Sequence, residues 1–229
     1  VKTSAITITE YNHPIVIGGV ADQPEWYQGD IRDFRIIKGT ALYTSNFTPP
    51  TEPLTAITDT VLLTCQSNRF VDNSVSAHAI TAFGNTSVMP YGPYDYLPYD
   101  PVVNGGSVYF DGTGDYLTTS STSPFNMGSG NFTIEGWIFT TSTIGPQRII
   151  NNWDSGTVAA ASWEILFAGG SGSLIFTAST GGTSSEVTLS TGAGGIVLGT
   201  WNHFAVVRNL NIFTLYVNGI LKSNVSNAI

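Results

Sequence analysis

Short segments in which apolar and polar residues alternate follow one another along almost the whole chain. Phe213, Leu215 and Val217 alternate with Thr214 and Tyr216, and similar runs recur between clusters of Gly, Asn, Ser and Asp. No window repeats apolar residues at the i, i+3, i+4, i+7 spacing of a helix over ten or more residues. This pattern predicts an all-β protein, an antiparallel two-sheet β-sandwich of the jelly-roll type. The expected strands are 4–11, 15–20, 29–37, 60–65, 79–84, 107–112, 115–119, 131–141, 148–153, 162–169, 173–179, 203–209, 212–219 and 220–223.

The clearest single element is a hairpin near the C-terminal end. Asn218-Gly219 separates two apolar, β-branched runs, and this dipeptide suits a type I′ turn, in which both central residues take a positive φ. Both faces of the strands before it are fairly apolar, as expected for central strands of a sandwich.

Composition narrows the function classes. Charged residues make up only 10% of the chain, so the surface must be built from Ser, Thr, Asn and Gly, and the net charge of −8 disfavours nucleic acid and anionic membranes as partners. No run of about 18 apolar residues occurs, so no membrane insertion is expected. The one cysteine, Cys65, excludes an intrachain disulfide framework and lies in an apolar strand, which indicates a buried thiol.

Two proline-rich segments interrupt the strand pattern. Residues 46–59 carry three prolines and are interpreted as a linker or domain boundary. Residues 89–101 carry four prolines and four tyrosines, among them Tyr94 and Tyr96, and proline keeps such a segment out of central strands. This second segment is either a tyrosine-lined contact for a glycan or protein, or a packed crossover that covers an edge of the sandwich.

The acidic residues do not form the pair that glycoside hydrolysis requires. A retaining hydrolase needs a nucleophile and an acid/base carboxylate about 5 Å apart. Glu135 and Glu164 stand alone in their strands, and Asp30 and Asp33, three residues apart, are expected to face opposite sides of one strand. No nucleophile-elbow, zinc-protease or phosphate-loop motif occurs. The chain is therefore expected not to be an enzyme.

Several segments carry a family resemblance. "GGSVYFDGTGDYL" (105–117), "FTIEGWIFT" (132–140) and "WNHFAVVRN…FTLYVNGIL" (201–221) resemble the laminin G-like branch of the concanavalin A-like lectin/glucanase superfamily. Residues 60–88 are similar to the opening strands of phage-associated members, and "IGGVADQPEWYQGDIRDFRIIKGTALYTSNFTPP" (17–50) is similar to the closing strands. The resemblance covers most of the chain and implies a concanavalin A-like sandwich.

The order of these segments differs from that of the family, whose closing strands follow the last hairpin. Residues 1–55 are therefore expected to be the closing strands of a laminin G-like domain, and residues 60–229 a body without its own closing strands. Three explanations remain open: a window from a multi-repeat protein, a permuted domain that closes on itself, or strands donated to a neighbouring chain. In each case residues 15–38 should fill a vacancy in a sandwich, in this chain or in an adjoining one.

No cofactor motif is present, and Ca²⁺ is the ion that the acidic residues favour most. In relatives, a structural calcium is often held by an aspartate of the closing strand and backbone oxygens near the opening strands, which implies Asp33, with Asp72 in the opening region. Asp111 and Asp115 in "DGTGD" flank a glycine-rich turn, and they either supply oxygen ligands or serve ordinary turn chemistry.

Aromatic residues supply the candidates for carbohydrate binding. Trp26 and Trp153 lie beside turns and are the best candidates for an exposed stacking platform, together with Tyr94 and Tyr96 of the proline-rich loop. Trp137 and Trp201 lie within apolar alternation and are expected in the core.

These observations favour a non-enzymatic structural or adhesive β-sandwich repeat of a virion-surface or extracellular fibre protein, with a phage fibre as the leading case. Its expected partners are copies of itself or other fibre proteins, and a host glycan under the alternative hypothesis that the chain is a lectin module. A degenerate glucanase is the rival from the enzyme class.

Overall fold

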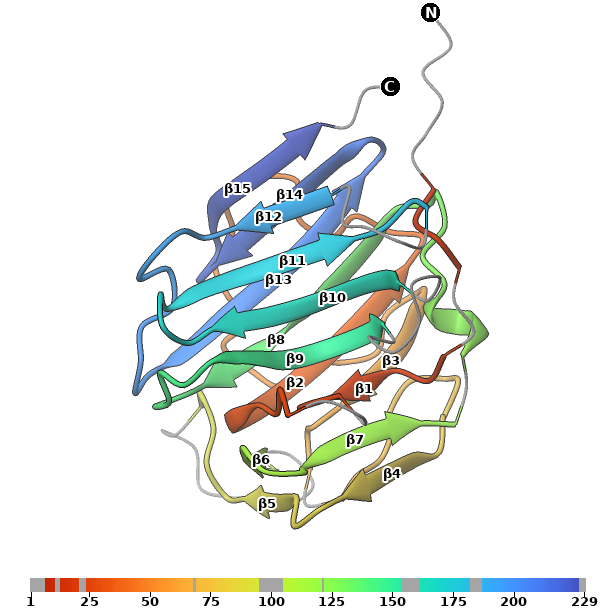
Figure 1. The fold of residues 1–229 in the computed structure, drawn as a ribbon. Coiled ribbons are helices and arrows are strands. Elements are labelled where there is room, and N and C mark those ends of the chain that lie inside the picture. Colours follow the sequence, from red (N-terminus) through yellow and green to blue (C-terminus); the bar gives the residue numbers. More distant parts are fainter. Residues whose placement is uncertain are drawn as a thin grey trace, which may run out of the picture.

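The computed structural model describes residues 7–10, 13–20, 24–67, 69–94, 105–120, 122–153, 161–181 and 187–226. Two antiparallel sheets stack face to face (Figure 1), which confirms the predicted all-β sandwich. The one helix in these ranges is a single 3₁₀ turn at Ser123–Phe125. None of the described residues belongs to a helix long and apolar enough to cross a membrane.

One sheet has seven strands, and its order does not follow the sequence. Across the sheet the strands are β12 (Val187–Ser190), β11 (Ser173–Ala178), β10 (Ala161–Ala168), β9 (Pro146–Trp153), β1 (Val16–Ile17), β7 (Tyr116–Thr119) and β4 (Ile80–Phe83).

The other sheet has eight strands, seven of them in its main path. These are β15 (Ile220–Ser226), β14 (Ile212–Val217), β13 (Trp201–Asn209), β8 (Phe132–Phe139), β2 (Gln28–Lys38), β6 (Ser107–Asp111) and β5 (Ser87–Met89), while β3 (Thr60–Thr64) pairs with β2 beside this path.

The core lies between the two sheets and is built by alternate residues of the strands. On β8, Phe132, Ile134 and Ile138 are fully buried in it, and from the opposite sheet Ile165 and Phe167 of β10 pack against the same cluster. The period of two in the sequence thus sorts each strand into an inner and an outer face.

The two strands from the N-terminal part of the chain lie in the middle of the sheets. Figure 1 shows β1 and β2 in red and orange among strands of much later colour. β1 pairs with β9 on one side and β7 on the other. β2 pairs with β8 along one edge, and with β6 and then β3 along the other edge. In this structure β1 and β2 therefore lie within the sandwich of their own chain.

The predicted hairpin is present between β14 and β15. Asn218 and Gly219 connect the strands with φ values of 51° and 74°, the positive pair that a type I′ turn requires. A side chain at Gly219 would collide with the backbone carbonyl oxygen of Phe47, so glycine is also required by a close approach of another segment.

That segment comprises residues 40–57 and crosses the outer face of the eight-stranded sheet; it is called the strap below. Leu42 N–H donates to Thr133 Oγ1 on β8 (2.8 Å), and Phe47 N–H donates to the Gly219 carbonyl (2.9 Å). Phe47 also packs against Tyr216 of β14. The proline-rich stretch interpreted as a linker thus lies largely within the strap and packs against the same sandwich. Because the strap covers their outer side, β13 and β14 are apolar on both faces.

Three details of the strand predictions differ from the structure. In the predicted strand 4–11, the described residues 7–10 form only an isolated bridge from Ile8 to Gly128. The edge strands β5 and β12 were not predicted, because three or four residues give too short a period for the sequence to distinguish them from loops.

Candidate functional site

A β-bulge in β2 gathers charged side chains on the outer face of the eight-stranded sheet. Arg32 lies opposite Trp137 and Arg35 opposite Glu135, so two residues of β2 oppose one residue of β8 between these pairs. Asp33 takes a φ of 49° there, a left-handed conformation that is uncommon outside glycine. The bulge resets the alternation, and both arginines project away from the core.

The same bulge overturns the expectation that Asp30 and Asp33 face opposite sides. Asp30 lies on the outer face and accepts a hydrogen bond from Ser107 Oγ (2.9 Å), while Asp33 contacts Leu54 of the strap. Burial raises the pKa of Asp30 to about 6, and the bond from Ser107 opposes that rise. The expectation was wrong because it assumed an unbroken two-residue period.

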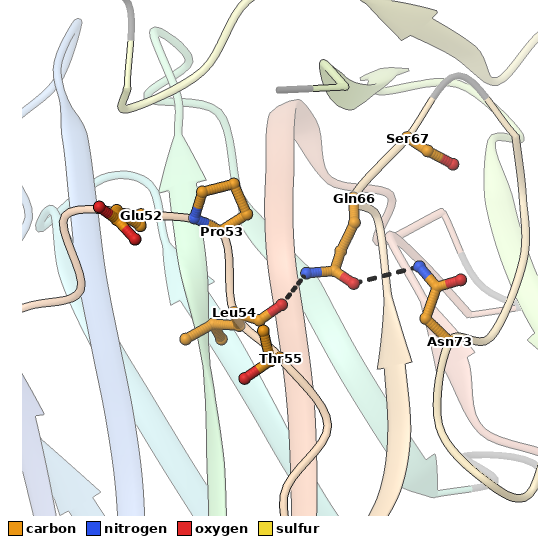
Figure 2. Close-up of a pocket in the computed structure, with 7 residues that line it drawn as sticks. All are labelled: Glu52, Pro53, Leu54, Thr55, Gln66, Ser67 and Asn73. Atoms are coloured by element: carbon orange, nitrogen blue, oxygen red, sulfur yellow. Dashed lines mark hydrogen bonds between the residues drawn. The ribbon is translucent and has the colours of Figure 1, made fainter. Parts of the chain in front are cut away.

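The buried carboxylate of Asp33 adjoins a surface pocket of about 360 Å³ between the strap and the loop after β3. Its Oδ1 accepts hydrogen bonds from Leu54 N–H (3.2 Å) and Gln66 Nε2 (2.5 Å), and its Oδ2 accepts one from Arg32 Nε (3.3 Å). Figure 2 shows Gln66 at the centre of the pocket, bonded to the Leu54 carbonyl and to Asn73. The pocket is lined by Glu52, Pro53, Leu54, Thr55, Gln66, Ser67 and Asn73.

Asp33 carries a charge that its neighbours compensate only in part. Burial raises its pKa, and the charge of Arg32 and the hydrogen bond from Gln66 offset only part of the rise. Asp33 Oδ1 and the Leu54 carbonyl oxygen both contact the same Gln66 nitrogen, at 2.5 and 2.6 Å. Two oxygens therefore converge on one point.

That convergence fits a hard cation. If the Gln66 amide turned over, its Oε1 would become a third oxygen at the same point, and waters from the pocket would complete the six to eight ligands that calcium takes. Asp33, Leu54 and Gln66 are the residues that would hold the ion, whose chemistry here would be the neutralisation of a buried charge. Of the four predicted aspartates, Asp33 is the one that fits.

Asp72 organises the loop after β3 instead. Its Oδ1 accepts hydrogen bonds from Leu63 N–H (3.0 Å) and Ser74 N–H (2.9 Å), and its Oδ2 accepts from Ser74 Oγ and His78 N–H (2.9 Å each). Four donors saturate the carboxylate, which does not fit a cation ligand.

Asp111 and Asp115 likewise serve the turn between β6 and β7. Buried Asp115 accepts hydrogen bonds from Asn85 N–H (2.7 Å) and Asp111 N–H (3.0 Å), and Asp111 accepts from Thr113 N–H (2.7 Å). These contacts are turn chemistry and do not fit a calcium site. In the described part of the chain no three His, Cys, Asp or Glu side chains form a group that could hold a metal.

Glu135 lies at the centre of a buried polar cluster beneath the strap. Its Oε1 accepts hydrogen bonds from Arg35 Nε (2.9 Å) and Nη2 (2.5 Å), and its Oε2 accepts from the Tyr43 hydroxyl (2.7 Å), with His203 Nε2 at 3.3 Å. Burial alone would raise the pKa of Glu135, but the hydrogen bond from His203 and the charge of Arg35 hold it below its usual value. Sequence reasoning missed this cluster, because its members come from four separate segments.

The four aromatic candidates do not gather at one site. Trp153 is half-buried at the end of β9. It lies five residues beyond Arg148, the β9 residue that forms a bridge with Trp26. Tyr94 is buried against the outer face of the other sheet, where the Arg32 guanidinium lies 4.9 Å from its ring centre. Burial and the nearby charge of Asp33 raise the pKa of Tyr94. Tyr96 lies outside the described residues.

Trp137 and Trp201 are not in the core as expected. Both lie on the outer face and are half-buried, because the alternation of β8 and β13 directs their neighbours inward. Trp201 packs with Phe139 (centroids 5.7 Å apart) and Tyr91 (5.4 Å). Apolar alternation on both faces could not show which face meets the core.

Trp26 lies in a second pocket, at one end of the sandwich. The pocket has a volume of about 140 Å³ and is lined by Pro24, Trp26, Gln28, Gly112, Ser142, Ile144, Gly145, Pro146 and Gln147. The backbone at Trp26 bridges Arg148 of β9 in parallel, and Arg148 pairs with Glu25 and with Glu164 Oε2 (2.6 Å). This ion-pair network fixes the backbone that precedes the tryptophan.

A family model described as Concanavalin A-like lectin/glucanases superfamily, Laminin_G_3, matches residues 111–228, which is more than half of the chain. The chain belongs to this superfamily. The match covers β7 to β15, and the concanavalin A-like fold accounts for the two stacked antiparallel sheets. No curated protein and no solved structure matches the chain significantly. Concanavalin A-like modules of the laminin G type bind carbohydrates or serve structural roles, so function must be argued from the site.

Proposed function

We propose that this chain is a non-enzymatic structural and adhesive module of an extracellular or virion-surface fibre protein, with a phage fibre as the leading case. The proposal places the module outside the cell or on the virion, and its partners are copies of itself, other fibre proteins or a surface glycan.

The observation that carries the non-enzymatic part is the engagement of the two strand glutamates. Glu135 lies on β8 of the eight-stranded sheet and is bound by Arg35, whereas Glu164 lies on β10 of the other sheet and is bound by Arg148. Two carboxylates on different sheets, each neutralised by an arginine, cannot flank one glycosidic bond as acid and nucleophile.

The low charge content and the similarity of residues 60–88 to phage-associated domains support the fibre assignment. A repeat that packs against other repeats needs a surface of small polar residues rather than a strong electrostatic field.

The test is a reducing-end assay on β-glucans and on capsular polysaccharides, with the intact chain and with Asp30→Asn. Asp30 is included because its pKa of about 6 makes it the acid best suited to proton transfer. No release of reducing ends is expected from either protein. Reproducible cleavage that Asp30→Asn, Glu135→Gln or Glu164→Gln abolishes would overturn the non-enzymatic assignment.

A further inference from the structure

We propose that copies of this chain join head to tail, with Leu210 of one copy inserted into the pocket of the next copy that Trp26 helps to line, called the Trp26 pocket below. This inference rests on the fibre part of the proposed function and names its partner, a second copy of the chain. Its failure would leave the non-enzymatic assignment untouched, because that assignment depends on Glu135 and Glu164.

Leu210 is an unusual residue for its place in the fold. It is the first of the two residues between β13 and β14, and it has a φ of 56°, whereas the φ of Asn211 is not positive. This is the pattern of a type II′ turn, whose first position normally takes glycine because a Cβ disfavours a positive φ. The side chain is also 73% exposed, so neither the backbone nor burial within this chain accounts for a leucine here. A contact with another molecule would account for it.

The turn holds Leu210 at the end of the sandwich. Its N–H donates a hydrogen bond to Asn131 Oδ1 (2.8 Å), and its carbonyl oxygen accepts one from Arg208 Nε (2.9 Å). Ile212, two residues later, is exposed as well, and residues 209–212 include no charged residue. The turn is therefore a fixed apolar knob, which has little conformational freedom to lose on binding.

The Trp26 pocket has the size and the lining that a leucine side chain needs. Its volume of about 140 Å³ is close to the ~150 Å³ of an apolar cavity that holds benzene. None of the nine lining residues carries a charged side chain, and Pro24, Ile144 and Pro146 supply apolar surface beside Trp26. A side chain added at Gly145, which is also part of the lining, would meet no atom within 4 Å, so this part of the lining faces open space.

Further exposed apolar side chains surround the pocket. Ile144 is 77% exposed, and Val197 and Leu198 are exposed in the loop before β13. Gly199 N–H donates a hydrogen bond to the Thr140 carbonyl (2.9 Å), so this loop lies against the loop between β8 and β9. Neither loop contains a charged residue. The apolar knob can therefore dock here without burying an unpaired charge, although each copy carries a net charge of −8.

The knob and the pocket lie at opposite ends of the sandwich, so they cannot meet within one copy. β8 begins at Phe132, which pairs with Arg208 beside the knob, and ends at Phe139, next to the loop that leads to the pocket. Its eight residues span roughly 25 Å. Figure 1 shows the turn between β13 and β14 and the start of β9 at opposite ends of the molecule. A contact between two different surfaces repeats from copy to copy, and it builds a filament unless the rotation closes a ring.

The experiment measures the weight-average mass of the intact chain over a concentration series, by sedimentation equilibrium and light scattering. The contact is small, so we expect a dissociation constant on the order of 0.1–1 mM and a mass that keeps rising past that of a dimer. Leu210→Asn should weaken association at least tenfold without lowering the melting temperature, because asparagine tolerates a positive φ better than leucine does. Ile144→Ser should also weaken it several-fold. Val75→Ser is the matched control, since it removes a 94% exposed side chain from a different loop, and it should leave association unchanged.

An equimolar mixture of the two variants tests the head-to-tail arrangement directly. The Leu210→Asn copy keeps its pocket intact, and the Ile144→Ser copy keeps its knob intact. One copy of each should therefore join as tightly as two wild-type copies do. Neither copy carries both intact surfaces, so the complex should stop at a dimer.

The proposal is overturned if the intact chain stays monomeric throughout the series, if its mass levels off at that of a dimer, or if neither variant changes association. It is also overturned if the mixture forms no dimer. A loss of association with Ile144→Ser but not with Leu210→Asn overturns it too, because another occupant then fills the pocket. Each of these results leaves the reducing-end assay, and hence the non-enzymatic assignment, standing.

Discussion

The Arg35 guanidinium donates two hydrogen bonds to a single oxygen of Glu135, although the two residues are 100 positions apart in the chain. Arg35 comes from the N-terminal strand β2, and Glu135 from β8, at the centre of the region that the family model matches. Both side chains are almost completely buried beneath the strap. The pair therefore ties the N-terminal strand β2 to the body of the sandwich.

Removing one partner of this pair should be strongly destabilising. Arg35→Met leaves the Glu135 carboxylate buried without its cation, and loss of a partner from a buried pair costs about 3–5 kcal/mol. The double variant Arg35→Met/Glu135→Leu should lose less than the sum of the two single losses, because neither charge is then stranded. Urea unfolding at pH 7 measures all three. A single-variant loss below about 1 kcal/mol would mean that the pair is not a structural tie.

The pH dependence of this pair has a definite sign. The pKa of Glu135 in the folded protein lies below its unfolded value, so the pair stabilises the protein above the unfolded pKa. That contribution is lost as the pH falls through the folded pKa. Acid unfolding should therefore be shallower in the double variant than in the wild type, as followed by circular dichroism. If the wild type and the double variant lose the same stability as the pH falls, this assignment is contradicted.

Asp30 should show the opposite behaviour. Its pKa rises from 3.8 to about 6 on folding, so the folded state binds more protons between these values and stability falls as the pH rises through them. Asp30→Asn should match the wild type at low pH and exceed it at neutral pH by about 1–2 kcal/mol. This is less than the ~3 kcal/mol that two pKa units represent, because solvent reaches part of the side chain. Glu52→Gln, an exposed acid at a pocket rim, is the matched control. Equal effects of the two substitutions at every pH would contradict the prediction.

Calcium should raise the melting temperature by binding at the point where Asp33 Oδ1 and the Leu54 carbonyl oxygen converge. An ion that binds only the folded state stabilises it by about 2.7 kcal/mol at a hundred times its dissociation constant, which is ~5–10 °C for a chain of this size. Asp33→Asn and Gln66→Leu should each abolish the calcium-dependent part of the shift, and Asp72→Asn should not. Calorimetry with calcium, magnesium and chelator makes the measurement. An unchanged melting temperature with calcium would show that no ion binds there and that the Gln66 amide alone satisfies the two oxygens.

Local patterns were sufficient to predict most of the strands, the sandwich and the turn at Asn218-Gly219, because alternation and positive-φ chemistry are encoded within a few residues. The bulge at Asp33 was not predictable in this way, since an aspartate gives little local sign of a left-handed conformation. The strap and the Glu135 cluster depend on contacts between distant segments, such as Asn46 with Leu221, which are 175 residues apart. The position of Trp26 beside a turn was visible in the sequence, but the pocket around it also needs Gln147 at the start of β9, which no local pattern places there.

The last prediction concerns the N-terminal segment as a whole. β2 pairs with three strands and β1 with two, so removal of residues 1–55 would interrupt both sheets at their centres. Four fully buried core side chains of β2 would be lost with it: Ile31, Phe34, Ile36 and Ile37. Each large buried side chain contributes roughly 1.5–3 kcal/mol, so their sum approaches or exceeds the ~5–15 kcal/mol stability of a typical domain. Residues 60–229 alone should therefore be unfolded or aggregated.

Adding residues 1–58 as a separate peptide should restore a dispersed NMR spectrum and a cooperative melt, because the peptide carries the strands and the strap. A permuted chain, in which a Gly/Ser linker joins residue 229 to residue 1 and the new chain starts at residue 60, should fold as well, since it keeps every strand contact. The Arg35→Met peptide is the matched control and should complement poorly. If residues 60–229 alone melt cooperatively and the peptide adds nothing, the N-terminal strands are not the closing strands of this sandwich.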